Sequence, residues 1–172
     1  MNPTVQLTRD ESEAAMSVAK RRNSLNGGQT NIPGGEMANA EARLKQHFVA
    51  CLAEIAAAKN LNRYWSGCGK GSTGLKDVGG FLEVRSITEM GRGLLVRPKD
   101  DPQDPYGLIF VTPELSCHLL GWAYGYEVIA HGRALDQNTQ RPCWILSSEQ
   151  LRPWDELIHV RGFRPYSLRA AV

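Results

Sequence analysis

Two acidic residues, Asp77 and Glu83, stand on either side of a pair of glycines and are the side chains best placed to do chemistry. Adjacent glycines permit a tight hairpin. A loop at residues 79–81 would pair Val78 with Leu82 and set Asp77 across from Glu83. Opposed residues of a ladder have Cβ atoms about 5 Å apart. Carboxylates that close repel each other unless a cation lies between them, and hard oxygen ligands favour Mg²⁺. The pattern therefore predicts a magnesium site.

A plain surface hairpin is the alternative interpretation of the same segment. Successive side chains of a strand alternate between its two faces, so Glu83 and Arg85 are expected to point the same way. In this interpretation Glu83 simply pairs with Arg85 or with Lys76. The segment alone leaves both interpretations open.

A long helix is expected to carry a third acid, Glu54. Apolar residues recur at helical spacing from about residue 39 to residue 61, and a run of alanines beside them makes one face smooth enough to lie close against a sheet. Glu54 falls among those alanines. Because an unpaired carboxylate is costly to bury, Glu54 needs a cation, which a metal ion or Arg85 would supply.

Short strand-like runs follow this helix. They lie at residues 76–78, 81–87, 94–98, 107–112, 116–123 and 143–146. The polar stretch at residues 131–142 is expected to be a loop, and a short helical turn is expected over residues 149–158. A helix followed by mixed or antiparallel strands predicts an α/β (α+β) domain.

The N-terminal part of the chain has a different character. Residues 7–24 form an amphipathic pattern with acids early and basic residues late, which matches the helix dipole. Residues 25–37 are rich in Gly, Asn, Pro and Gln and are typical of a linker. We therefore expect residues 1–36 to be an arm or a loosely docked helix, and residues 37–172 to be a single domain.

The composition excludes several classes of protein. The 172 residues are 42% hydrophobic and 22% charged, with a net charge of +2, and no apolar run approaches the ~18 residues that cross a bilayer. No secretory signal is recognisable, so a cytoplasmic protein without a membrane partner is expected. Four cysteines without a C-x-x-C pair predict neither disulfides nor a zinc site. The glycine-rich stretch at residues 66–75 lies between a helix and a strand, the reverse of a dinucleotide-binding turn, and is expected to be a loop.

The order of the three acids resembles that of a known family. Asp77 followed by Glu83-Val84-Arg85 is similar to the D…(D/E)-x-K signature of the PD-(D/E)XK, or restriction-endonuclease-like, nucleases. That family has an acid on a helix, then the Asp on a strand, then E-x-K on the next strand, and Glu54, Asp77 and Glu83 come in this order. Residues 40–157 also resemble small uncharacterised phage and prophage proteins that carry an EVR variant of the motif.

The resemblance implies a restriction-endonuclease-like core, in which the acidic helix packs on a central mixed sheet. It implies that Asp77, Glu83 and the backbone carbonyl of Val84 hold Mg²⁺ (or Mn²⁺) and that a DNA phosphodiester bond is hydrolysed. Glu54 would orient the attacking water, act as a base or join a second metal site. Many nucleases of this fold dimerise, so a homodimer is a further expectation.

The chain departs from the family at Arg85, which stands where the signature has Lys. Arg stays protonated and cannot serve as a general base, although it can hold the attacked phosphate. Lys70 or Lys76 is a candidate to replace the missing lysine. Lys70, Lys76 and Arg92 are also candidate DNA contacts, with a solvated surface charge as the alternative for Lys70 and Arg92.

Two functions therefore remain open at the level of the sequence. The first is a metal-dependent DNA endonuclease or nickase, encoded by a phage and acting in the host cytoplasm. The alternative is a catalytically inactive protein with the nuclease fold that binds DNA or a protein partner. The three acids favour the enzyme, and Arg85 favours the alternative.

Overall fold

A computed structural model of the chain describes residues 2–25, 40–67, 75–135 and 142–160. The helices and strands are, in chain order, β1 (Thr4–Gln6), α1 (Arg9–Leu25), α2 (Ala40–Leu61), β2 (Glu83–Ile87), β3 (Leu94–Val96), β4 (Pro105–Val111), β5 (Ser116–Tyr124), α3 (Gly125–His131), β6 (Arg133–Leu135), β7 (Cys143–Leu146), and the 3₁₀ helices η1 (Ser148–Gln150) and η2 (Trp154–His159).

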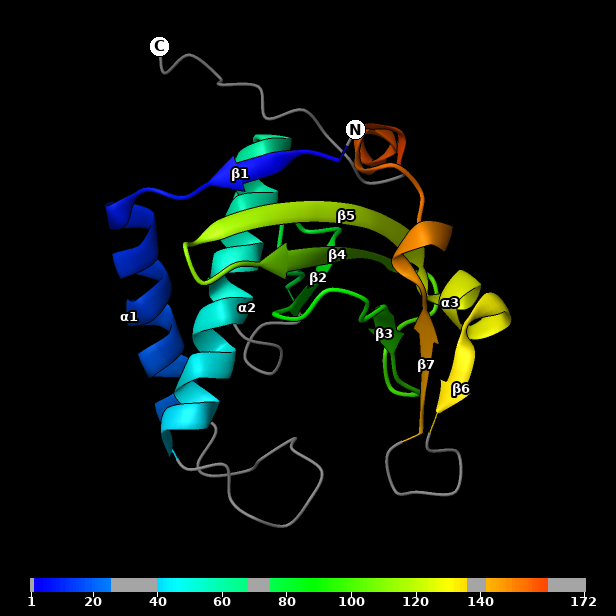
Figure 1. Ribbon diagram of the computed structural model, residues 1–172, viewed down its shortest axis with the longest axis horizontal. Coiled ribbons are helices and arrows are strands. Elements are labelled where there is room, and N and C mark those ends of the chain that lie inside the picture. Colours follow the sequence, from blue (N-terminus) through cyan, green and yellow to red (C-terminus); the bar gives the residue numbers. More distant parts are fainter. Residues whose placement is uncertain (1, 26–39, 68–74, 136–141, 161–172) are drawn as a thin grey trace.

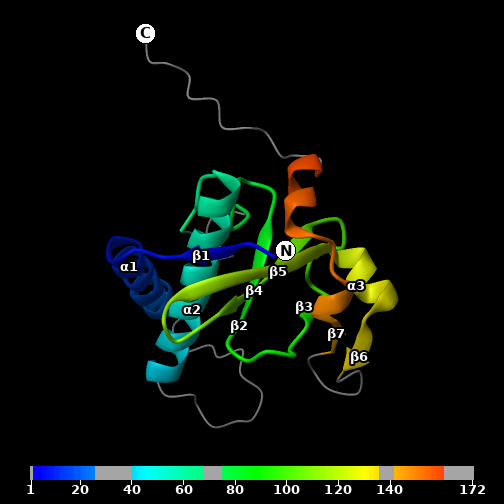
Figure 2. The same cartoon turned by 45° about the horizontal axis from the view of Figure 1, so that its top comes forward.

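The main sheet is mixed. Its strand order is β1-β5-β4-β2, with β2 parallel to β4 and the remaining pairs antiparallel. Helices α1 and α2 lie on one side of it, and the smaller antiparallel sheet β3-β7-β6 lies with α3 on the other (Figures 1 and 2). The predicted α/β class and mixed sheet are confirmed.

Helix α2 is the central helix of the structure. Every residue from Cys51 to Ala58 is buried, so this stretch has no solvent face. One side contacts the main sheet, and the other contacts α1, where Ala15 and Ala19 are fully buried. Small side chains on both helices let their backbones approach closely at normal interior density. The long helix expected from residue 39 to 61 is confirmed almost to the residue.

The helix expected over residues 7–24 is present as α1, but the N-terminal segment belongs to the main sheet and core, whereas an arm or a loosely docked helix was expected. Strand β1 pairs with β5, opposing Val5 to Cys117, and the Val5 and Leu7 side chains are buried. Helix α1 begins with a capping box, because the Thr8 hydroxyl accepts from Glu11 N while the Glu11 carboxylate accepts from Thr8 N. The main sheet therefore includes strands from both sides of the boundary expected at residue 36.

Two short elements, α3 and β6, were not predicted. Residues 131–142 were expected to form a loop, but residues 133–135 form β6, which pairs with β7. The preceding helix α3 was not predicted. Both elements are short, so their stability comes from packing on β7 and β3 rather than from local propensity. Within the described ranges, no helix is long and apolar enough to span a membrane.

The role of the N-terminal segment is testable with a pair of identical substitutions. Leu7→Ala is expected to lower the free energy of unfolding by about 2–5 kcal/mol, because it removes a buried side chain and leaves a cavity. Leu25→Ala removes the same atoms from a residue that is 74% exposed and is expected to leave stability unchanged. Urea denaturation measures both. Equal urea midpoints for the two variants would contradict a structural role of residue 7 and would favour a loosely attached N-terminal arm.

Candidate active site

The hairpin at residues 77–83 forms as predicted. Val78 and Leu82 exchange two backbone hydrogen bonds, each with an N···O distance of 3.1 Å, around a loop of residues 79–81. Gly79 and Gly80 have φ angles of +60° and +75°, in the left-handed region that glycine enters without steric cost. Asp77 directly precedes this bridge on one arm and Glu83 directly follows it on the other, where β2 begins.

Asp77 is buried, and its protonation is shifted toward the neutral form. Its Oδ2 accepts a hydrogen bond of 2.9 Å from the backbone N–H of Val84, the residue after Glu83. Burial raises the pKa of Asp77, and the negative charge of Glu54 raises it further, while the Val84 N–H acts in the opposite direction. A positive charge close to the Asp77 carboxyl group would therefore be favourable.

Glu54 has a cation partner, and that partner is Arg22 of α1. The two guanidinium nitrogens Nη1 and Nη2 of Arg22 donate to Oε1 and Oε2 of Glu54 at 2.7 and 2.8 Å, and Trp65 Nε1 donates to Oε2 at 2.8 Å. Both charged side chains are more than nine-tenths buried. The expected partners, a metal ion or Arg85, are not needed to explain why this carboxylate is buried. Its proposed part in a metal site stays a prediction.

Glu83 is 1% exposed and lies between two cations. Lys76 Nζ is 3.9 Å from its Oε1, and Arg85 Nη1 is 3.8 Å from its Oε2. These separations are those of ion pairs and are too long for direct hydrogen bonds. The structure thus brings together the residues of both sequence interpretations, the opposed acids and the neighbouring cations.

Arg85 is held by partners of its own. Its Nη2 donates to Asp100 Oδ2 at 2.8 Å and its Nε to the carbonyl of Leu95 at 3.3 Å. Its guanidinium carbon lies 5.0 Å from the centre of the Tyr106 ring, within cation–π range. These contacts fix the planar guanidinium beside Glu83.

Asp100 and Asp104 are site residues that sequence reasoning missed. Asp104 accepts from Lys76 Nζ, and Asp100 accepts from Arg85. Both lie just before β4, which pairs in parallel with β2 so that Tyr106 is opposite Glu83. The three acids of residues 100–104 were a visible signal, but only the parallel register carries them to the hairpin.

The residues gathered here form one charged cluster with more acids than bases. The charged cluster consists of Asp77, Glu83, Asp100, Asp104, Lys76 and Arg85. Its four acids exceed its two bases by two charges when all six are ionised. Such an excess attracts a divalent cation.

The donors in the charged cluster fit Mg²⁺ in one specific way. In the described parts of the chain, no three His, Cys, Asp or Glu side chains lie close enough to hold a metal ion together, so a site built wholly from protein side chains does not fit. Mg²⁺ characteristically takes one or two carboxylates and completes its shell with water and substrate phosphate. Asp77 and Glu83 supply two such carboxylates, one on each arm of the hairpin.

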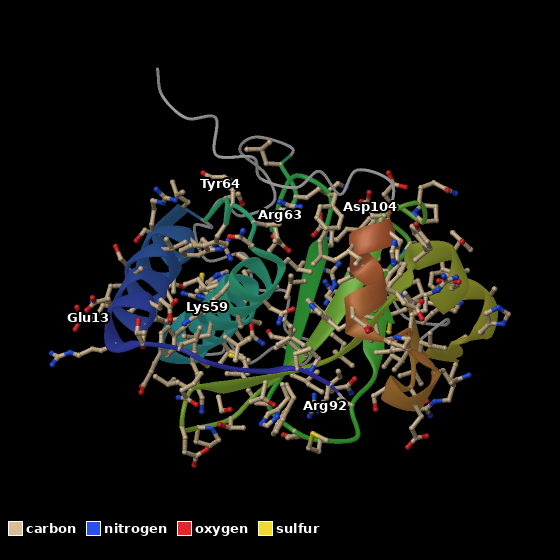
Figure 3. The ribbon with its side chains drawn as sticks, turned by 90° about the horizontal axis from the view of Figure 1, so that it is seen from above. Glu13, Lys59, Arg63, Tyr64, Arg92 and Asp104 are labelled. Atoms are coloured by element: carbon tan, nitrogen blue, oxygen red, sulfur yellow. The ribbon has the colours of Figure 1, made fainter. Side chains whose placement is uncertain are left out.

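One predicted DNA contact, Arg92, does not join the charged cluster. Arg92 pairs with Glu89 at 2.8 Å and lines a separate groove of about 380 Å³ beside residues 86–88, at the other end of β2. Figure 3 shows Arg92 and Asp104 on opposite sides of the molecule. Lys70 lies outside the described residues.

The cysteines give no sign of metal or redox chemistry in the described residues. Cys51 and Cys117 are free and buried, Cys143 is buried as well, and Cys68 lies outside the described ranges. Burial raises the pKa of the Cys51 thiol to about 12 and that of Cys117 to about 11. These thiols stay protonated and behave as small apolar side chains.

Fold and site together define an α/β protein with paired carboxylates on a hairpin. No protein-family model, no curated protein and no solved structure matches the chain. The function is therefore argued from the geometry of the charged cluster and of the groove beside it.

The ion pair between α1 and α2 is expected to matter strongly for stability. Arg22→Met leaves the Glu54 carboxylate buried without its cation and is expected to cost about 3–5 kcal/mol of unfolding free energy. The double variant Arg22→Met/Glu54→Gln removes both charges and is expected to recover most of that loss. Urea denaturation at pH 7 measures the cycle. Arg9→Met, which breaks an exposed ion pair with Glu13, is the control and should change nothing measurable; a wild-type midpoint for Arg22→Met would refute the expectation.

Asp77 gives a pH dependence of defined sign. Its pKa is raised in the folded state, so its contribution to stability is fully present below the unfolded pKa of about 3.9 and is lost as the pH rises through the folded value. Asp77→Asn keeps an acceptor for Val84 N–H and carries no charge. Without added metal, the variant is expected to be more stable than wild type at pH 7, with the difference vanishing toward pH 4. Thermal unfolding across this range checks the sign, and a less stable variant at pH 7 contradicts it.

Proposed function

We propose that this chain is a divalent-metal-dependent DNA endonuclease or nickase of the PD-(D/E)XK type. The observation that carries the proposal is the hairpin closed by the Val78–Leu82 bridge, which has Asp77 on one arm and Glu83 on the other, with Lys76 and Arg85 both within 4 Å of the Glu83 carboxylate. Metal-dependent cleavage of a phosphodiester needs carboxylates that hold a cation and positively charged side chains that hold a phosphate. The charged cluster has both.

In this proposal Asp77 and Glu83, with the carbonyl of Val84, hold Mg²⁺ or Mn²⁺. When bound, such an ion lowers the pKa of a coordinated water and polarises the scissile phosphate. The chain's own contribution is to keep the two carboxylates opposed through the Val78–Leu82 pairing and the hydrogen bond from Val84 to Asp77. The raised pKa of Asp77 favours binding of a cation, because a cation relieves the same repulsion that a proton relieves.

Lys76 and Arg85 divide the work that one lysine does in the family signature. Lys76 is a compact ammonium, and its Nζ lies 3.9 Å from Oε1 of Glu83. Arg85 stays charged, and its rigid attachment to Asp100 and the Tyr106 ring suits it to neutralise a phosphate oxygen in the transition state. Lys76 is therefore our candidate for the missing lysine.

Glu54 acts in this scheme as a positioning residue. Its carboxylate is held by Arg22 and Trp65, and its charge raises the pKa of Asp77. It thereby increases the affinity of the Asp77 side for a cation without itself needing to bind one.

A second candidate function is a nuclease-fold protein that binds DNA or a protein partner without cleaving. The observation that favours it is the set of contacts around Arg85, since Asp100, the Leu95 carbonyl and the Tyr106 ring give this arginine a sufficient structural role. In that case Arg85 replaces a catalytic lysine by a group that stabilises the hairpin.

Cleavage of supercoiled plasmid distinguishes the two. Wild type is expected to nick or linearise the plasmid with Mg²⁺ or Mn²⁺ and not with EDTA. Glu83→Gln, which removes the charge and preserves the shape, is expected to reduce the rate by about 100-fold or more, because loss of a metal ligand is at least as severe as loss of a group that orients one.

Glu89→Gln is the matched control for this experiment. Glu89 is an exposed acid on the turn after β2, paired with Arg92 away from the charged cluster, and its substitution is expected to leave cleavage intact. Metal-dependent cleavage that survives in Glu83→Gln would overturn the assignment of the site. Absence of cleavage by wild type, together with a salt-sensitive gel shift, would establish the second candidate.

A further inference from the structure

A groove of about 290 Å³ lies beside the charged cluster, between residues 63–66 on one side and residues 75–80 on the other. It arises because the chain leaving α2 runs antiparallel to the hairpin. Trp65 forms a bridge with Val78, and Gly79 N donates to the carbonyl of Tyr64 at 2.9 Å. The groove is thus built on backbone pairing and on the hairpin that holds Asp77.

Tyr64 forms an exposed aromatic wall of this groove. Alternation along the extended segment turns Trp65 inward, where it donates to Glu54, and so turns Tyr64 outward. Tyr64 is 64% exposed and Leu75 is 48% exposed. Two large apolar side chains at one groove offer a flat surface on which a planar ligand would bury area.

The opposite wall includes Leu75 and Lys76 and carries no side chain at Gly79 and Gly80. A Cβ atom added to Gly80 would meet nothing within 4 Å, and one added to Gly79 would lie 3.2 Å from Cδ of Arg63. The stem of Arg63 therefore lies against the hairpin, while the Gly80 side leaves space for a ligand to approach the chain closely.

The charged residues of the groove are basic. Arg63 and Lys76 line it, and none of its described lining residues is acidic. Lys76 also lies 3.9 Å from Glu83, so one side chain belongs both to the groove and to the charged cluster. Figure 3 shows Arg63 and Tyr64 on the same side of the molecule as Asp104, the other ion-pair partner of Lys76. An anionic ligand in the groove would extend toward the carboxylates.

We propose that this groove binds one unstacked nucleotide of a DNA strand, so that the strand to be cut is single-stranded or locally unpaired, as strands are in the segments of a negatively supercoiled plasmid that open under torsional stress. The base stacks on Tyr64, and its phosphate is met by Arg63 and Lys76. The next phosphodiester group is thereby directed to Asp77 and Glu83. The choice of DNA as the ligand rests on the proposed function.

The size and the chemistry of the groove favour a single nucleotide. Its volume of about 290 Å³ lies near the lower limit of small-ligand sites, which is a size that suits one base. Bases in a duplex have their faces covered by stacking, whereas an unpaired base offers a face to an aromatic side chain. An aromatic wall beside basic residues is the usual construction of sites for single-stranded nucleic acid.

Binding is measured by fluorescence anisotropy in EDTA, which separates it from metal-dependent cleavage. The probes are a fluorescein-labelled oligothymidylate of about a dozen nucleotides and a labelled duplex of equal length. Wild type is expected to bind the single strand more tightly than the duplex. Tyr64→Ala is expected to weaken binding of the single strand by about 10-fold, because it removes one stacking platform, and Tyr64→Phe is expected to retain it.

Matched controls isolate stacking and charge. Met90→Ala removes another exposed apolar side chain, 65% exposed, from the turn after β2 and is expected to leave binding unchanged. Arg63→Gln is expected to weaken binding and reduce its salt dependence, whereas Arg9→Gln removes a charge paired with Glu13 on α1 and is expected to do neither. Equal affinity of wild type and Tyr64→Ala, or preference for the duplex, would overturn the proposal.

The outcome is distinguishable from that of the plasmid experiment. Plasmid cleavage with unchanged binding by Tyr64→Ala refutes the nucleotide groove and leaves the nuclease in place. Loss of single-strand binding in Tyr64→Ala without any cleavage by wild type supports the groove and refutes the nuclease. Binding of neither probe by wild type refutes the groove as a nucleic-acid site and leaves an apolar peptide as its remaining occupant.

Discussion

The structure around the candidate site depends on the buried ion pair between Arg22 and Glu54. It joins α1 to α2 through two hydrogen bonds of 2.7 and 2.8 Å, in an interior otherwise packed with alanines. Glu54 also accepts from Trp65, and Trp65 pairs with Val78 of the hairpin. A single carboxylate thereby connects the N-terminal helix, the central helix and the segment that carries Asp77. Because an ion pair is expensive to bury and more expensive to break, this connection is sensitive to change at any of its members.

The Glu54 carboxylate acts both on the fold, through its ion pair with Arg22, and on the candidate site, through its effect on Asp77. Glu54 is compensated by Arg22, but its charge still acts on Asp77 and raises the pKa of that residue. Asp77 therefore weakens the folded state at neutral pH unless a cation approaches. A buried acid whose pKa is raised by burial and by a neighbouring carboxylate, as that of Asp77 is, is a common feature of catalytic sites. The apolar packing of α2 against α1 and the main sheet offsets this local repulsion.

Local features of the fold were predictable from the sequence, and distant contacts were not. The helix over residues 40–61 follows from its own periodicity, and the opposition of Asp77 and Glu83 follows from two adjacent glycines, because each involves only near neighbours. The partner of Glu54 lies 32 residues away, and no spacing rule identifies it. Asp100 and Asp104 reach the charged cluster only through the parallel pairing of β2 with β4. Strand β1 was missed for the same reason, since its partner β5 is more than a hundred residues distant and its three residues carry little pattern of their own.

The arginine at the position of the signature lysine becomes intelligible when the two cations beside Glu83 are considered together. Arg85 is bound on three sides, by Asp100, by a backbone carbonyl and by an aromatic ring, so its charge is fixed in place and its proton is not available. Lys76 is a quarter exposed, donates to Asp104 and lies beside both the Glu83 carboxylate and the groove. Two cations of different chemistry thus lie at Glu83, a planar guanidinium and a compact ammonium. In the proposed nuclease, Lys76 supplies the lysine that the motif lacks, and the Arg at position 85 is then compatible with catalysis.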